Sequence, residues 1–268
     1  MKKNSSIFKV IMYAIIFLLI FPLIILGIWS FLKIWPWPSL IPKDFGIRGF
    51  KYILDPSKKS LRVLCFSVCL SSVVTFITLL ISIPAAKALG VYNFKGKGLF
   101  KILVLAPIIV PTVSVAMGIH VVFMKLGLAN TFMGVVLVHL IPCIPYSIRI
   151  LTNVFEIIGD SMEMQARVLG ASPLQTFVRI TLPLIAPGLL SAASLVFIVS
   201  FSQYFLTFLI GGGRIVTLSM LMFPYIQSGD RMMASAYSVI FILTTLVVLL
   251  VIEKVVKSYY KGQNHFYI

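Results

Sequence analysis

The sequence predicts an all-α membrane protein with six transmembrane helices. Only 11% of its 268 residues are charged, whereas an ordinary soluble domain carries about a quarter charged residues. The mean hydropathy is +1.07. Six apolar runs, nearly free of charge, each approach the roughly 20 residues that a helix needs to cross a bilayer core of about 30 Å. We therefore expect one transmembrane domain over residues 1–268.

The six expected spans follow one another along the whole chain. Their residue ranges are 10–32, 63–89, 102–124, 126–152, 188–210 and 232–255. The first run follows a basic head, as in a signal peptide, but it exceeds the roughly 7–15 apolar residues of a cleaved signal, so we expect a retained helix. The fifth span is placed after Pro183 and Pro187, because prolines interrupt the start of its apolar run.

The distribution of Lys and Arg predicts the orientation. With both termini in the cytoplasm, thirteen of the 23 basic residues lie inside and ten outside, so the positive-inside rule favours this orientation by a narrow margin. The first loop, residues 33–62, holds four prolines and two tryptophans and is expected to lie as an elbow on the outer leaflet. Because the positive charge is spread over the loops, we expect Lys95, Lys97 and Lys101 to face lipid headgroups, and no nucleic acid to be bound.

Residues 156–183, between the fourth and fifth spans, carry the signals of a water-facing helical hairpin. Asp160 and Glu163 have the spacing of a capping box at the start of a first helix, and Gly170 supplies a left-handed residue at its end. The run SPLQ, residues 172–175, has a second capping-box spacing with proline at the first helical position. The local chemistry therefore predicts two helices joined by a tight turn.

The hairpin also contains a longer pattern. Gly170 is followed, after nine residues, by Ile180, any residue, Leu182 and Pro183. This pattern resembles the second half of the signature E-A-A-x3-G-x9-I-x-L-P of the inner-membrane permeases of binding-protein-dependent ABC importers. The stretches ISIPAAKALG, LAPIIVPTVSVAMGI and IPYSIRIL resemble core helices of the same family. The resemblance implies the MetI-like fold of type I importers, in the cytoplasmic membrane of a bacterial cell.

The first half of the signature departs from the family pattern. The E-A-A positions are occupied by Met164, Gln165 and Ala166, so only the third position matches. Glu163 lies one residue early, which rotates its side chain by about 100° around the helix. The acidic contact that the family makes to its ATPase is therefore expected to be shifted, weakened, or supplied by a partner permease.

The resemblance implies that the hairpin is a coupling helix, docked on a separate ATP-binding subunit. The residues expected to couple to that ATPase are Glu163, Met164, Gln165, Ala166, Gly170, Ala171, Ser172, Pro173, Ile180, Leu182 and Pro183. The implied partners are two copies of the ATPase, a second permease that is a related chain or an identical one, an extracytoplasmic solute-binding protein, and membrane lipid. The chain itself has no G-x-x-x-x-G-K-[ST] motif, so we expect neither an enzyme nor a bound cofactor or metal.

Two other classes of protein compete with this interpretation. An ion-coupled secondary transporter normally carries a carboxylate inside a span, but all seven acidic residues fall in loops or at span edges. Sodium held by backbone carbonyls at broken helices stays open. A membrane enzyme is disfavoured because the chain lacks H-E-x-x-H and G-x-S-x-G motifs. His120 and His139 are expected to bond between helices, and Cys65, Cys69 and Cys143 to be buried as small apolar side chains.

Prolines and polar residues inside the spans indicate a translocation pathway. Prolines free backbone carbonyls and bend helices, and transporters use such bends to line cavities. The expected pathway residues are Pro107, Pro111, Pro142, Ser202 and Gln203. The last spans are similar to those of the subfamily that imports polyamines, ferric iron, thiamine or aminoethylphosphonate. A polyamine is the expected solute and the others are alternatives, although a neutral Gln203, where relatives often carry an acidic residue, weakens the case for a polycation.

Overall fold

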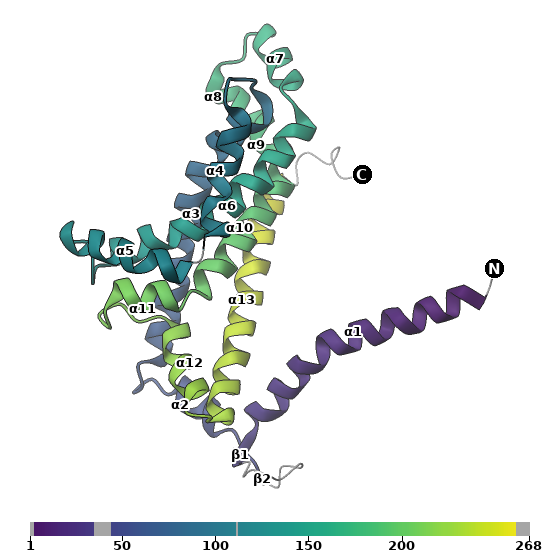
Figure 1. Cartoon of the computed structure of the whole chain (residues 1–268). Coiled ribbons are helices and arrows are strands. Elements are labelled where there is room, and N and C mark those ends of the chain that lie inside the picture. Colours follow the sequence, from purple (N-terminus) through teal and green to yellow (C-terminus); the bar gives the residue numbers. More distant parts are fainter. Residues whose placement is uncertain (1–2, 35–43, 111, 261–268) are drawn as a thin grey trace. The chain divides into compact units, whose positions relative to one another are not determined.

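The structure is a computed structural model that describes residues 3–34, 44–110 and 112–260. Helices make up most of this part of the chain (Figure 1). In chain order they are α1 (Lys3–Ser30), α2 (Arg48–Leu54), α3 (Ser60–Val91), α4 (Lys97–Ile109), α5 (Thr112–Lys125), α6 (Phe132–Ile158), α7 (Ser161–Val168), α8 (Pro173–Thr176), the π-helix η1 (Phe177–Thr181), α9 (Leu182–Leu184), α10 (Ala186–Phe201), α11 (Phe205–Gly211), α12 (Leu218–Gln227) and α13 (Arg231–Tyr260). Strands β1 (Leu32–Ile34) and β2 (Asp44–Phe45) pair antiparallel, with Leu32 opposite Phe45.

Among the described residues, four helices are long and apolar enough to cross a membrane. They are Phe8–Ser30, Ser60–Val91, Phe132–Ile158 and Arg231–Ser258. Two bent pairs raise the number to six if each pair is one span: α4 with α5, bent by 95°, and the run Pro173–Leu184 with α10, bent by 73°. Counting both pairs gives six candidate spans, but the second pair begins at Pro173, whereas the fifth span was expected to begin only at residue 188.

Two of the differences between the helices and the expected spans lie close to the expected pathway residues. The fourth span was expected from residue 126, but α6 begins at Phe132, where the Thr131 side chain caps the helix by accepting a bond from the backbone N–H of Gly134. The fifth was expected to run through residues 188–210, but α10 ends at Phe201 and the helix resumes only at Phe205. The break falls at the two polar residues expected to line the pathway, Ser202 and Gln203.

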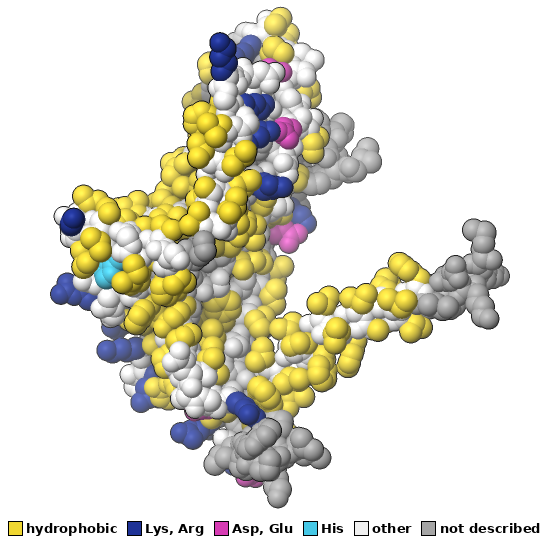
Figure 2. All heavy atoms as spheres, in the orientation of Figure 1, with side chains coloured by type: hydrophobic (Ala, Val, Ile, Leu, Met, Phe, Trp, Pro, Cys, Tyr) yellow, Lys and Arg dark blue, Asp and Glu magenta, His cyan; other side chains and the backbone are white. Residues whose placement is uncertain are grey.

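The described chain divides into two compact units, each with its own packing. One comprises residues 1–64 and 220–244, and the other residues 65–219 and 245–268. In the first unit, α2 approaches α13 so closely that a Cβ at Gly49 would lie 2.7 Å from the Cβ of Ala236. Residues 8–29 of α1 are mostly apolar and none of them is buried (Figure 2), the pattern of a helix whose surface faces lipid.

In the second unit, α6 is the central helix and packs against α4, α10 and α11. Glycine permits the close approach of α10, because a Cβ at Gly188 would lie 2.5 Å from the Cγ2 of Val154. The core around α6 is built mainly from small and branched apolar side chains. Its buried members are Leu70, Val74, Ala116, Val135, Val136, Val138, Leu140, Cys143, Val196, Leu206 and Ile210.

His139 on α6 confirms the expectation of a hydrogen bond between helices. Its Nδ1 lies 3.0 Å from the hydroxyl of Ser200 on α10, and its Nε2 lies 2.8 Å from the hydroxyl of Thr207 on α11. Thr207 donates its one hydroxyl proton to the carbonyl of Gln203, so it accepts from Nε2–H and Ser200 donates to Nδ1. The imidazole therefore links the helices on both sides of the break at Ser202.

The cysteines follow the expectation only in part. Cys143 is buried in the core of the second unit, whereas Cys65 and Cys69 are exposed on α3. The prediction that all three are buried was therefore wrong. Cys65 and Cys69 lie four residues apart, which places them on one face of α3, and that face is turned away from the core.

Candidate functional site

The hairpin between α6 and α10 consists of two helices joined by a turn, as the sequence predicts. Helix α7 is followed by Gly170, which adopts a positive φ of +85°, and the second helix starts at Pro173. The Ser172 hydroxyl accepts a bond from the backbone N–H of Gln175 at 3.3 Å, and the Gln175 side chain accepts one from the backbone N–H of Ser172 at 3.0 Å. The expected second capping box is therefore confirmed. Figure 1 shows α7 and α8 together at one end of α6.

The second helix of the hairpin widens before Pro183. Residues Phe177–Thr181 form a π-helix, and the N–H of Leu182 bonds to the carbonyl of Phe177, five residues earlier. A proline inside an α-helix removes one hydrogen bond and crowds the carbonyl four residues before it. The wider π turn lets the helix continue from α8 into α9, so the signature residues Ile180, Leu182 and Pro183 lie on one continuous helical stretch.

Glu163 does not act as a helix cap. Asp160 makes no side-chain cap bond, and the Glu163 carboxylate instead receives bonds from Lys87 Nζ on α3, at 2.6 and 2.8 Å, and from the Thr181 hydroxyl at 2.6 Å. Arg167 Nη2 lies 3.9 Å away. The prediction of a first capping box was therefore wrong. Glu163 is only 7% exposed, and a buried carboxylate is stabilised more by a lysine charge and a hydroxyl than by a single peptide N–H.

The ionisation of Glu163 follows from these contacts. Burial raises its pKa, but the hydrogen bonds from Lys87 and Thr181 and the positive charges of Lys87 and Arg167 together lower it below the usual value of 4.5. The stabilisation linked to this shift is fully present above pH 4.5 and is lost as the pH falls through the lower folded-state pKa. We call Lys87, Glu163 and Thr181 the clasp. It ties α7 to α3 and to the π-helix at neutral pH.

The outward side of the hairpin is apolar. Val168 and Leu169 are each 87% exposed, Leu174 is 71% exposed and Met164 54% exposed. We call these four residues, with Gly170, the hairpin tip. A Cβ at Gly170 would meet nothing within 4 Å, so within this chain the glycine is needed for its backbone conformation and not for packing. Exposed clusters of large apolar side chains mark surfaces that bind another protein or a membrane.

A groove beside the tip collects most of the signature residues. It has a volume of about 290 Å³ and lies between α7 and the helix after it. The residues expected to couple that line it are Gln165, Ala166, Ile180 and Pro183. Glu163 is withdrawn into the clasp, and Gly170 lies at the turn outside the groove. The structure thus places the expected coupling residues on one hairpin but on three different surfaces of it: the clasp, the groove and the exposed turn.

The expected pathway residues are not gathered in one place. Pro107 on α4 lines an apolar hollow of about 250 Å³ together with residues of α5, α6 and α11. Ser202 and Gln203 lie at the break between α10 and α11, where the Gln203 carbonyl accepts bonds from Thr207 and Ser219. Pro142 is half-buried inside α6. Pro111 lies outside the described residues.

Sequence reasoning missed two charged contacts. Lys87, at the end of a predicted span, holds the buried Glu163, and Lys101 pairs with Glu156 at 2.5 Å. The Lys101 side chain stays 40% exposed in this pair, so the expectation that Lys101 faces lipid headgroups stays a prediction. The available signal for Lys87 was its position: a lysine at the end of an otherwise apolar helix needs either the interface or a partner.

Comparison with known proteins finds a family model that matches more than half of the chain. Residues 78–260 match the family model described as "Binding-protein-dependent transport system inner membrane component". The chain is 33% identical over 154 residues to a trehalose/maltose transport system permease protein of Thermococcus litoralis, covering 58% of this chain and 55% of the relative. It is 25% identical over 223 residues to a putative 2-aminoethylphosphonate transport system permease protein of Salmonella typhimurium, covering 82% and 83%.

A third relative is the putrescine transport system permease protein of Escherichia coli, 28% identical over 143 residues and 51% of each chain. The matches span 55%, 61% and 66% of the first three relatives' own length. A crystal structure of a bacterial ABC transporter involved in alginate import aligns with a TM-score of 0.71 and 19% identity, covering 94% of this chain and 96% of that one. At this identity the alignment shows a shared fold.

Proposed function

The chain belongs to the family of binding-protein-dependent transport system inner membrane components, and we propose that it forms the translocation pathway of an ABC importer together with a second permease. In this proposal an extracytoplasmic binding protein delivers a small solute, and two ATP-binding subunits supply the energy. The chain is a permease of the MetI superfamily, so ATP hydrolysis is assigned to its partners. Both termini and the hairpin are proposed to lie in the cytoplasm.

The hairpin carries this proposal. Its tip exposes four large apolar side chains to water, and burying such side chains contributes about 1.5–3 kcal/mol each. A groove of the ATPase that covers Val168, Leu169 and Leu174 would remove this apolar surface from water. The clasp would then pass movement of the docked hairpin to α3, because Glu163 on the hairpin is bound to Lys87 on that helix. Such a connection supports an alternating-access mechanism driven by the ATPase.

The solute is proposed from charge and from the relatives. Polyamine import is supported by the putrescine permease of Escherichia coli. Import of an aminophosphonate is supported by a match that covers a larger share of both chains, and by a pathway break that carries the neutral Gln203 where a polycation would favour an acidic side chain. Ferric iron and thiamine are further candidates from the same subfamily resemblance. We rank a small anionic or zwitterionic solute first and a polyamine second.

Reconstitution tests the proposal. The chain is co-expressed with the ATPase and binding protein encoded beside it, and uptake of putrescine and of 2-aminoethylphosphonate into proteoliposomes is measured. We expect uptake to require both ATP and the binding protein. Uptake that is driven by an ion gradient without ATP would contradict an ATP-driven importer and would indicate an ion-coupled carrier instead. A catalytically inactive ATPase is the control.

A further inference from the structure

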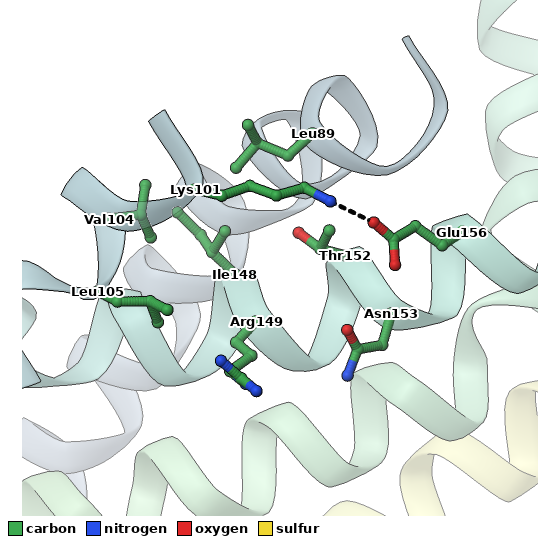
Figure 3. A pocket seen from close by; sticks show the side chains of 9 residues that line it. All are labelled: Leu89, Lys101, Val104, Leu105, Ile148, Arg149, Thr152, Asn153 and Glu156. Atoms are coloured by element: carbon green, nitrogen blue, oxygen red, sulfur yellow. Dashed lines mark hydrogen bonds and ion pairs between the residues drawn. The ribbon is translucent and has the colours of Figure 1, made fainter. Parts of the chain in front are cut away.

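A second hollow in the larger unit carries polar side chains that the hairpin does not use. It lies between α3, α4 and α6 and has a volume of about 170 Å³ (Figure 3). Apolar side chains from all three helices form part of its wall. The polar residues of its lining are Lys101, Arg149, Thr152, Asn153 and Glu156. We call this hollow the α6 pocket.

Most of these polar residues lie on one stripe of α6. Arg149, Asn153 and Glu156 are spaced by four and three residues, which places them on the same helical face. The neighbouring positions Ile148 and Leu151 are buried in the core. The stripe therefore belongs to the side of α6 that the packing of the larger unit leaves open. Figure 3 shows the side chains of Lys101 and Glu156 meeting on one side of the stripe and the Arg149 side chain extending away from them.

The charges of the α6 pocket do not cancel. Lys101 and Glu156 form an ion pair at 2.5 Å, so their charges offset each other and Arg149 supplies the net positive charge. A guanidinium presents five N–H donors in a planar fork. Within residues 3–34, 44–110 and 112–260, Arg149 has no ion pair with an acidic side chain.

Thr152 gives an independent sign of an absent ligand. The residue is only 6% exposed, it lines the pocket, and its Oγ1 has no hydrogen-bond partner among the described residues. A buried hydroxyl without a partner destabilises the folded state. A ligand atom that bonds to Thr152 would remove this penalty. Figure 3 shows the Thr152 side chain on the same side of α6 as Lys101, with its oxygen turned away from Glu156.

We infer that the α6 pocket binds a compact oxyanion, such as a phosphate, phosphonate or sulfate group. Arg149 supplies the charge and a forked pair of donors, which suit the oxygens of such a group, the Asn153 amide on the same side of α6 supplies a further donor, and the Thr152 hydroxyl lines the same pocket. The Lys101–Glu156 pair closes one side without adding net charge. The ligand is either the anionic group of the transported solute or the phosphate of a lipid headgroup. The first source rests on the proposed function, whereas binding of the oxyanion does not.

Thermal unfolding tests the inference on the permease purified with its ATPase subunits in lipid-free detergent. Inorganic phosphate is the probe, with chloride at equal ionic strength as the reference. A ligand that binds only the folded state raises the midpoint in a concentration-dependent manner. We expect this rise in the wild type. For Arg149→Gln we expect apparent affinity for phosphate to fall at least tenfold, since bonds to charged groups contribute about 1.5–3 kcal/mol.

Two further variants test whether phosphate binds in the α6 pocket or elsewhere on the protein. Thr152→Val conserves side-chain shape and should weaken phosphate binding about fivefold, the effect of losing one hydrogen bond of about 1 kcal/mol. Arg214→Gln removes the same charge from an exposed turn outside the pocket and should leave phosphate binding unchanged. Equal midpoint shifts in the wild type, Arg149→Gln and Thr152→Val would overturn the inference, and so would an equal loss in Arg214→Gln.

Two arms distinguish the sources of the oxyanion. If the ligand is a lipid headgroup, added phosphatidylglycerol should abolish the phosphate-dependent rise, and 2-aminoethylphosphonate should bind no more tightly than inorganic phosphate. If it is the solute, 2-aminoethylphosphonate should bind more tightly than inorganic phosphate and the lipid should not compete. Either result supports the pocket, and competition by neither overturns it. Stimulation of the ATPase by the binding protein is measured in parallel. Normal stimulation without phosphate binding would reject the pocket alone, whereas phosphate binding without stimulation would reject the proposed function alone.

Discussion

The hairpin and the break between α10 and α11 are both interruptions of the helical chain, but they are held by different forces. The turn of the hairpin depends on neighbours in sequence: Gly170 with its positive φ and the capping box of Ser172 and Gln175. The break at Ser202–Tyr204 is held from a distance, through His139 on α6 and Ser219 in the first turn of α12. Local interruptions can therefore be read from the sequence, whereas those held by tertiary contacts cannot.

The clasp adds a tertiary contact to the locally encoded hairpin, and reversing its charge should have the largest effect. Lys87→Glu would place a second carboxylate beside Glu163, which is 7% exposed. Breaking such a pair costs on the order of 3 kcal/mol. We expect solute uptake to fall at least tenfold while the protein still inserts in the membrane. The measurement is uptake per inserted permease.

The reciprocal exchange is the control for the clasp. Lys87→Glu combined with Glu163→Lys restores an ion pair and should recover part of the uptake lost in each single variant. If neither single variant changes uptake, the clasp does not transmit motion. If the double variant is as inactive as the singles, the two residues act separately and the contact between α3 and α7 is incidental.

Gly170→Val tests the turn of the hairpin, which depends on neighbouring residues in the sequence. At a φ of +85° a β-branched residue strains the backbone by about 1–3 kcal/mol. Since no atom lies within 4 Å of the position of the new Cβ, the remaining effect falls on a docked partner. We expect co-purification of the ATPase to be lost while membrane insertion stays normal. Gly170→Asn, which tolerates the left-handed region, should retain more of the ATPase. Full ATPase binding and uptake in the valine variant would make the hairpin a simple connector.

Thr207→Val tests the tertiary support of the break. The substitution removes the acceptor for His139 Nε2–H and the bond to the Gln203 carbonyl. An unpaired buried imidazole donor costs about 1–3 kcal/mol. We expect a lower midpoint of thermal unfolding and altered uptake, because Gln203 loses one of its anchors. Thr207→Ser keeps the hydroxyl and should behave as the wild type. A valine variant with unchanged stability would show that the break does not need this bond.

Ser172→Ala should have the smallest effect. Removal of a capping hydroxyl costs about 1 kcal/mol, and here the loss is confined to the start of α8 on an exposed turn. Hydrogen exchange should increase at the backbone amides of residues 174–176, with little change in α6 or α10. Ser172→Asp, another good cap, is the matched control. Faster exchange throughout α10 would mean that the cap stabilises more than its own turn.

The sequence by itself determined the features that depend on neighbouring residues. The apolar runs specify the helices that suit a bilayer, because each backbone bond of a helix is made within a few residues. Gly170 and the run 172–175 likewise specify the turn and the second helix. The signature around these residues identified the family. The same local reasoning failed for Asp160 and Glu163, where the capping-box spacing was present but the bonds were not formed.

Only the tertiary structure decided where the charged side chains find their partners. Lys87 and Glu163 lie 76 residues apart, and Lys101 and Glu156 lie 55 apart. Such pairs depend on which faces of α3, α4 and α6 pack together, and no spacing along the chain reports that. The α6 pocket has the same origin, since the Thr152 hydroxyl loses access to water only when the helices assemble. Burial makes the free energy of a polar group depend on its partners, and the partners come from distant parts of the chain.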